Sequence, residues 1–139
     1  MRVVLDTNVL VAAAGSSTGA SAWLLTQADQ GKVSPLATTA LLLEYEDVLS
    51  RPKTELITGR SAQDLRRIFV TLAALTEPVH IRWRYRPLLG DPSDEMVLEA
   101  ALNGLAPYIV THNVRDFVGA SAFGISVITP GDFARRFRA

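Results

Sequence analysis

The sequence predicts an α/β domain with three layers, in which helices flank a mainly parallel central sheet. Short β-branched segments alternate with longer helical segments along the whole chain, and this alternation is typical of parallel sheets. The chain has 139 residues, of which 48% are hydrophobic, so it can bury one sizeable core. No linker, repeat or low-complexity stretch interrupts it, and we expect a single domain over residues 1–139.

Five short apolar or β-branched runs are the predicted strands, and helical segments separate them. The strands are expected at residues 2–5, 33–37, 79–83, 108–111 and 125–128. The helices are expected at about residues 8–14, 20–30, 39–50, 61–77 and 92–104, with a last helix from residue 130.

Breaking and capping residues justify the boundaries in the first half of the chain. Residues 15–19 include two glycines that break the first helix, and Gly31 stops the second. A proline within the second strand indicates an irregular or edge position. Thr38 or Thr39 caps the third helix, which Pro52 ends.

The same kinds of residue set the boundaries in the second half. Ser61, with Asp64 three residues later, is a capping box that opens a helix with one apolar face, and Pro78 closes that helix. Asp91 caps the next helix, with Pro92 at its first position. The last helix opens with Thr129, Pro130 and Asp132.

The composition excludes several kinds of site. The chain has no cysteine, which excludes a disulfide framework, a thiolate zinc site and a cysteine nucleophile. Its only histidines, His80 and His112, are too few for an all-histidine metal site. Any metal must therefore be held mainly by oxygen, which favours Mg²⁺ or Mn²⁺. Because the formal net charge is zero, a nucleic-acid partner requires a local basic patch or bound cations.

The amino terminus imitates a signal peptide, since Arg2 precedes two apolar runs. Asp6 and Asn8 interrupt the apolar core that export requires. No apolar run approaches the roughly 18 to 20 residues that span a bilayer. We therefore expect a cytoplasmic protein without a membrane partner.

Two acidic residues follow predicted strands. Asp6 comes directly after the first strand, and Asp116 lies just beyond the strand at 108–111. Ligands of open parallel sheets bind outside the carboxyl ends of the strands, so both acids are expected at the functional edge. Each aspartate could instead only cap the helix or turn that follows it.

Helical projection selects one further acid on the helix at 39–50. Glu44 projects to the margin of the apolar stripe, whereas Glu46 and Asp47 project to the opposite side and are expected in solvent. A carboxylate at the edge of a buried face loses hydration unless it is paired or binds a cation. Glu44 is therefore a candidate functional residue.

The same projection on the helix at 92–104 selects Asp94. It lies in the middle of the apolar stripe and is expected to turn inward, whereas Glu95 and Glu99 are expected toward solvent. Asp94 could equally be the reciprocal partner of an Asp91 cap, and both interpretations stay open. Four acids at one sheet edge would repel one another without a counter-ion. A bound Mg²⁺ or Mn²⁺ would relieve that repulsion, and such clusters hydrolyse phosphodiester bonds.

Five segments of the chain occur together in an order that is characteristic of one family. They are VVLDTNVLV, LLLEYEDVLSRP, DPSDEMVLEAAL, YIVTHNVRDF and ISVITPGDF, and they extend from Val3 to Phe133. With these segments the sequence resembles the PIN-domain ribonucleases, specifically the VapC-like toxins of prokaryotic toxin–antitoxin pairs. The resemblance implies a PIN-like α/β/α fold, an RNA substrate, a small antitoxin that inserts a segment across the acidic cleft, and a homodimer.

The resemblance also implies a magnesium-dependent endoribonuclease. Its catalytic acids match Asp6, Glu44, Asp94 and Asp116. The three aspartates would hold Mg²⁺ or Mn²⁺, and Glu44 would orient or deprotonate the attacking water. The expected products carry a 5′ phosphate and a 3′ hydroxyl.

Supporting polar residues of the family match Thr7, Asn8 and Thr111. Many members have an aspartate where this chain has Asn113. An amide oxygen can bind a metal but brings no negative charge. We therefore expect one well-occupied metal site, with any second cation arriving with the RNA.

A basic and aromatic segment is a candidate RNA-binding site. Arg82, Arg84 and Arg86 alternate with Trp83 and Tyr85, so an extended backbone would place arginines on one face and rings on the other. Arginines suit phosphates, and the rings could stack on bases. The same pattern fits a strand end with one packed face and one solvated face.

Two alternatives to a ribonuclease remain open from the sequence. A degenerate PIN-like domain could bind RNA or a partner without catalysis; Asn113 favours this alternative, and the four acids argue against it. A haloacid dehalogenase-like phosphatase also begins with an apolar strand that ends in aspartate. The sequence Asp6-Thr7-Asn8 lacks the second aspartate of that motif.

Overall fold

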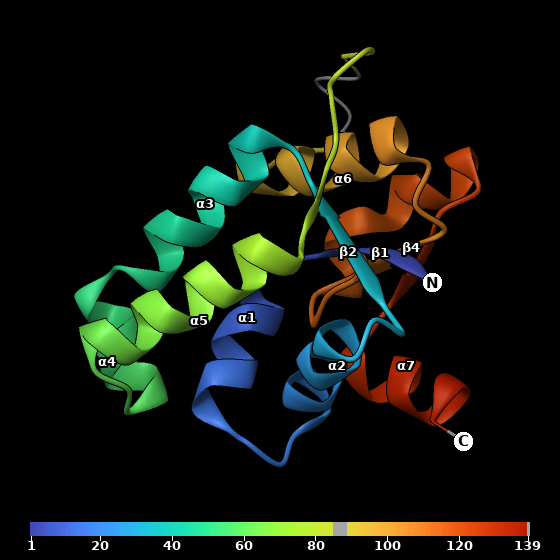
Figure 1. Ribbon diagram of the computed structural model, residues 1–139. Coiled ribbons are helices and arrows are strands. Elements are labelled where there is room, and N and C mark those ends of the chain that lie inside the picture. Colours follow the sequence, from blue (N-terminus) through green and yellow to red (C-terminus); the bar gives the residue numbers. More distant parts are fainter. Residues whose placement is uncertain (85–88, 139) are drawn as a thin grey trace.

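The computed structural model describes residues 1–84 and 89–138, which form a parallel sheet between layers of helices (Figure 1). The sheet has five strands in the order β3-β2-β1-β4-β5, and every neighbouring pair is parallel. The strands are β1 (Arg2–Leu5), β2 (Ser34–Ala37), β3 (Glu77–Pro78), β4 (Tyr108–Val110) and β5 (Ser126–Ile128). The predicted fold class, a three-layer PIN-like α/β/α domain, is confirmed.

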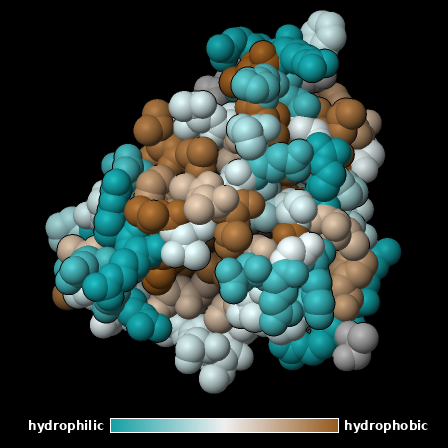
Figure 2. Space-filling model, viewed as in Figure 1, coloured by the Kyte–Doolittle hydropathy of each residue, from teal (hydrophilic) through white to brown (hydrophobic). Residues whose placement is uncertain are grey.

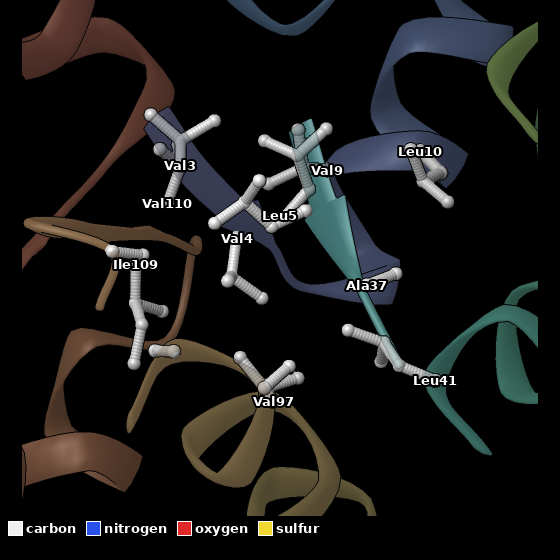
Figure 3. Close-up of a cluster of buried hydrophobic side chains, with 14 of the residues drawn as sticks. Val3, Val4, Leu5, Val9, Leu10, Ala37, Leu41, Val97, Ile109 and Val110 are labelled. Carbon is white, nitrogen blue, oxygen red and sulfur yellow. The ribbon is translucent and has the colours of Figure 1, made fainter. Parts of the chain in front are cut away.

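Helices cover both faces of the sheet. They are α1 (Thr7–Gly15), α2 (Ala20–Asp29), α3 (Thr39–Leu49), α4 (Pro52–Thr58), α5 (Ala62–Leu75), α6 (Pro92–Gly104), the 3-10 segment η1 (Val114–Phe123) and α7 (Pro130–Phe137). Figure 3 shows Val4 of β1 pointing to the side where Val97 of α6 lies, whereas Val9 of α1 lies on the other side. Figure 2 shows hydrophobic side chains gathered over α3 and α5 on one outer face.

The central strand β1 brings the candidate site together. All three residues from Val3 to Leu5 are buried, as expected for a strand covered on both faces. Leu5 pairs with Val110 of β4, and the backbone N–H of Asp6 donates to the Val110 carbonyl over 3.0 Å. The residues that follow β1 and β4 therefore emerge side by side at the carboxyl edge of the sheet.

The predicted helix caps are confirmed. The Thr38 hydroxyl accepts from the N–H of Leu41, and the Ser61 hydroxyl accepts from the N–H of Asp64, each over 3.1 Å. The Thr129 hydroxyl accepts from the N–H of Asp132 over 3.1 Å at the start of α7. These side chains satisfy backbone donors that a helix leaves unpaired at its first turn.

The third strand was predicted at residues 79–83, and this prediction is wrong. The strand is Glu77–Pro78, which pairs with Leu36 and Ala37 of β2. The N–H of Val79 still donates to the carbonyl of Ala37, but Ala37 is the last residue of β2. No further residue of β2 is therefore available to pair with the chain. Residues 79–84 therefore leave the sheet.

Two short helices were not predicted. Pro52 was expected only to end a helix, but it also begins α4, because proline is well tolerated in the first turn. The segment after β4 forms η1 instead of a plain loop, and it contains a kink at Phe117.

No single helix in the described ranges is long and apolar enough to cross a membrane. In the same ranges, α1 and α2 together have the length and composition of a membrane span, but a 101° bend separates them.

Candidate active site

Asp6 is the buried centre of the site. It follows β1 as the N-cap of α1, and only 6% of its surface is exposed. Its Oδ1 accepts from the backbone N–H of Thr7 over 2.8 Å, and its Oδ2 accepts from the hydroxyl of Thr111 over 2.7 Å. Both carboxylate oxygens are thus held by the ends of two neighbouring strands.

Asn8 and Thr111 form a small polar network around this carboxylate. The Asn8 amide nitrogen donates to Oδ2 of Asp6 and to the Thr111 hydroxyl, each over 3.3 Å. The Asn8 amide oxygen accepts from the N–H of His112 over 3.2 Å, and the N–H of Asn113 donates to the Thr111 hydroxyl over 3.0 Å. The network fixes the loop after β4 against the start of α1.

Burial raises the pKa of Asp6, because the charged form loses hydration. The hydrogen bonds from Thr111 and Thr7 oppose this effect and stabilise the ionised carboxylate. The negative charge of Asp116 raises the pKa further. Asp116 itself is exposed in the first turn of η1, where its N–H donates to the Asn113 carbonyl.

Asp94 lies in the first turn of α6, and its pKa is raised to about 6. Partial burial is the largest cause, followed by the negative charges of Asp91, Asp6, Asp116 and Glu95. No hydrogen bond within the described residues stabilises its carboxylate. The cap of α6 is instead Asp91, whose Oδ1 accepts from the N–H of Ser93 over 2.7 Å.

Glu44 faces the same region from α3. It is half-buried, and its Oε1 accepts from the Ser93 hydroxyl over 3.3 Å, one residue before Asp94. Glu44 and Ser93 line one open groove together with Thr7 and Asn8. The four predicted acids therefore lie around one end of the sheet, although no direct contact joins Glu44 to Asp6 in the described residues.

Across residues 1–84 and 89–138, no three acidic or histidine side chains are close enough together to coordinate one metal ion. Asp6, Asp94 and Asp116 are nevertheless near enough to raise the pKa of Asp94 and of Asp6 by mutual repulsion. An all-oxygen set of carboxylates fits a hard divalent cation, and a bound cation would offset that repulsion. The donor chemistry thus suits Mg²⁺ or Mn²⁺.

Comparison with known proteins identifies the family. A family model described as a PIN domain matches residues 2–115. The chain belongs to the PIN domain family. PIN domains are generally nucleases, which favours a nuclease site over the phosphatase alternative. No curated protein sequence matches the chain.

Among the solved structures similar to this chain is one with a TM-score of 0.64. It is the crystal structure of VapBC2 from Rickettsia felis bound to a DNA fragment from its promoter. The sequence identity is 15%, and the alignment covers 93% of this chain and 98% of the other. At this identity the likeness establishes the fold.

Of the arginines predicted to bind RNA, Arg82 lies apart from Asp94. Arg82 and Arg84 are exposed, and the N–H groups of Arg82 and Trp83 donate to the Asn103 side chain over 2.8 and 2.9 Å. Asn103 is at the carboxyl end of α6, nine residues and roughly 13 Å from Asp94 along the helix. Arg86 lies outside the described residues.

Glu95 and Glu99 were expected toward solvent, and this prediction is wrong. Both side chains are buried, with exposed fractions of 5% and 2%. Glu95 accepts a hydrogen bond from the backbone N–H of Leu89. Leu89, just before α6, therefore contacts a helix face that projection alone assigns to water.

Sequence reasoning missed Tyr45. Its ring is buried beneath the site, and its hydroxyl donates to the carbonyl of Leu5, the residue before Asp6. Burial raises the pKa of Tyr45, and the negative charge of Asp6 adds to this effect. The residue follows Glu44 within an apolar stripe, so the sequence pattern indicates only a core side chain.

Proposed function

We propose that this PIN domain is a metal-dependent endoribonuclease that hydrolyses phosphodiester bonds of RNA. The observation that carries the proposal is the buried carboxylate of Asp6, which two strand ends hold in place and whose charge raises the pKa of Asp94. Within the described part of the chain, the Asp94 and Asp116 carboxylates accept no hydrogen bond, and a fixed carboxylate among such neighbours is better suited to a cation than to a purely structural role.

The three aspartates would hold Mg²⁺ or Mn²⁺, directly or through water. When bound there, the cation activates water and neutralises charge that develops on the phosphate. Asn113 brings no charge, which supports one resident cation, with any second one arriving with the RNA.

The chain's own side chains orient the reacting groups. Thr111 and Thr7 fix the Asp6 carboxylate, and Asn8 ties both strand ends together. Glu44 orients or deprotonates the attacking water, and the Ser93 hydroxyl holds one of its oxygens. The products then carry a 5′ phosphate and a 3′ hydroxyl.

We further propose that the protein is the toxin of a toxin–antitoxin pair that acts on RNA in the cytoplasm. The fold shared with a chain of VapBC2 supports a small antitoxin as partner. A segment of this antitoxin would lie across the acidic cleft. A homodimer is supported by an apolar groove of about 240 Å³ between α2 and α5, whose lining includes Leu25, Ile68 and Leu72. Apolar surface of this kind is commonly covered by another chain.

A cleavage assay on total cellular RNA tests the enzymatic proposal. Wild-type protein from a nuclease-free preparation should cut RNA with Mg²⁺ or Mn²⁺, and Asp6→Asn should abolish cleavage while the circular dichroism spectrum stays unchanged. End mapping should find 5′ phosphates and 3′ hydroxyls. Undiminished cleavage by Asp6→Asn would refute the proposal. A folded wild-type protein that binds RNA but does not cut it would favour the degenerate alternative, for which Asn113 is the specific observation.

A further inference from the structure

One open groove between α1 and α3 has Glu44 in its lining. It has a volume of about 660 Å³, within the range of about 300 to 1,000 Å³ of small-molecule sites. Its lining includes Thr7, Asn8, Glu44 and Ser93, which belong to the candidate active site. The groove is therefore continuous with the place where the scissile phosphate would lie.

The rest of the groove is mostly apolar. Val11 and Ala12 follow one turn after Asn8 on α1, and Val48 follows one turn after Glu44 on α3. Ile57 of α4 adds to this lining and is 62% exposed. An apolar wall this close to a charged site has no evident role in holding a cation.

A cationic side chain lies beyond the apolar part. Arg51 lines the groove seven residues after Glu44, at the turn between α3 and α4. Its guanidinium pairs with Asp47, and both side chains are more than half exposed. Exposed ion pairs of this kind contribute little free energy, so Arg51 can turn to a phosphate instead.

We propose that this groove holds a nucleotide of single-stranded RNA beside the scissile phosphate. The base or ribose lies against Val11, Val48 and Ile57, and Arg51 contacts the next phosphate. Bases of a duplex are stacked inside the helix and cannot enter such a groove, whereas bases of loops and single strands can. The assignment rests on the proposed function, because it takes the acids as the place of cleavage.

RNA is favoured over a protein segment for two reasons. The groove is lined by Glu44 and by Thr7 and Asn8, which follow Asp6 directly, and its lining also includes Arg51, whose charge suits a second phosphate. Val48 and Ile57 then act as specificity-determining residues, since their shape limits which bases fit.

RNA binding by the Asp6→Asn variant tests the groove, because this variant is expected to leave the RNA probe uncut. The probe is a short fluorescein-labelled single-stranded RNA of mixed sequence, compared in Mg²⁺ with a duplex of equal length by fluorescence anisotropy. Arg51→Ala should weaken single-strand binding by about tenfold or more, as expected for lost hydrogen bonds to a charged group. Ile57→Ser should weaken it several-fold.

Two matched variants control for charge and for apolar surface. Lys53→Ala removes a nearby exposed cation, and Leu56→Ser removes an apolar side chain that is 86% exposed; neither residue lines the groove. Both should bind like the parent. In the wild-type background, Arg51→Ala should raise KM for single-stranded RNA more than it lowers kcat.

The outcomes separate this inference from the proposed function. Equal affinities for the groove variants and their controls, or equal affinity for duplex and single strand, would overturn the inference and leave the groove to a protein partner. If wild-type protein cleaves RNA but the binding results overturn the inference, the proposed function still stands. If wild-type protein does not cleave RNA, the proposed function fails whatever the groove variants do.

Discussion

The hydroxyl of Thr111 donates a 2.7 Å hydrogen bond to Oδ2 of Asp6, across a separation of 105 residues in the sequence. The bond exists because β1 and β4 are neighbours in the sheet and both end at the same edge. Thr111 is fully buried, so the bond forms where water cannot compete. The orientation of the Asp6 carboxylate therefore depends on a residue at the end of another strand.

Thr111→Val should reduce cleavage by about tenfold or more while the protein stays folded. Valine keeps the shape but removes the donor that holds Asp6, and loss of such supporting bonds commonly costs about 10- to 100-fold in metal affinity or activity. The free energy of unfolding of this variant should also be lower than that of the wild type by about 1 kcal/mol. Cleavage rates and urea unfolding check both effects, and Thr111→Ser, which keeps the hydroxyl, should retain most activity. Wild-type cleavage by Thr111→Val would show that the bond does not orient the carboxylate.

Asp94 should make the metal-free protein less stable as the pH rises. Its pKa is about 6 in the folded protein against an ordinary value of 3.8, so the folded state binds the proton more tightly. The stability that protonated Asp94 contributes is complete below about pH 4 and is lost as the pH rises through about 6. Asp94→Asn should therefore raise the Tm in EDTA at pH 7.5, and the difference from wild type should vanish near pH 4.

Thermal unfolding in EDTA between pH 4 and pH 8 measures this difference. Asp132→Asn is a suitable control, because that exposed carboxylate pairs with Arg135 in α7, away from the acids. A gain in Tm for Asp94→Asn that is the same at every pH would contradict the assignment of the shifted pKa.

The sequence was sufficient to predict the order of most strands and helices and the acids at the sheet edge. Those inferences depended on local signals, such as the caps Ser61 and Thr129 and the position of Asp6 after a β-branched run. Strand β3 could not be placed, because its length depends on where its partner β2 ends. Glu95 likewise contacts Leu89, which lies outside α6. Contacts outside the element itself decide both features, and helical or strand periodicity carries no information about them.

Tyr45→Phe should lower the free energy of unfolding by about 1 to 2 kcal/mol. The change removes the donor to the buried Leu5 carbonyl without altering the packing of the ring. Urea unfolding measures the loss. Tyr108→Phe is a matched control, because the Tyr108 hydroxyl has no hydrogen bond within the described residues. An equal loss for both variants would mean that the bond to Leu5 contributes no stability.

Glu44→Gln should reduce cleavage by about a hundredfold or more, because a residue that activates the attacking water contributes roughly 10²- to 10⁴-fold. Glu46→Gln makes the same change two residues away on α3, where the carboxylate pairs with Arg66 at the surface, and should cleave RNA like wild type. Mg²⁺ should raise the Tm of Glu44→Gln as much as that of wild type, since the aspartates hold the cation. The same ion should raise the Tm of Asp6→Asn far less. If Glu44→Gln loses both cleavage and the Mg²⁺-induced rise in Tm, then Glu44 binds the metal and does not act on water.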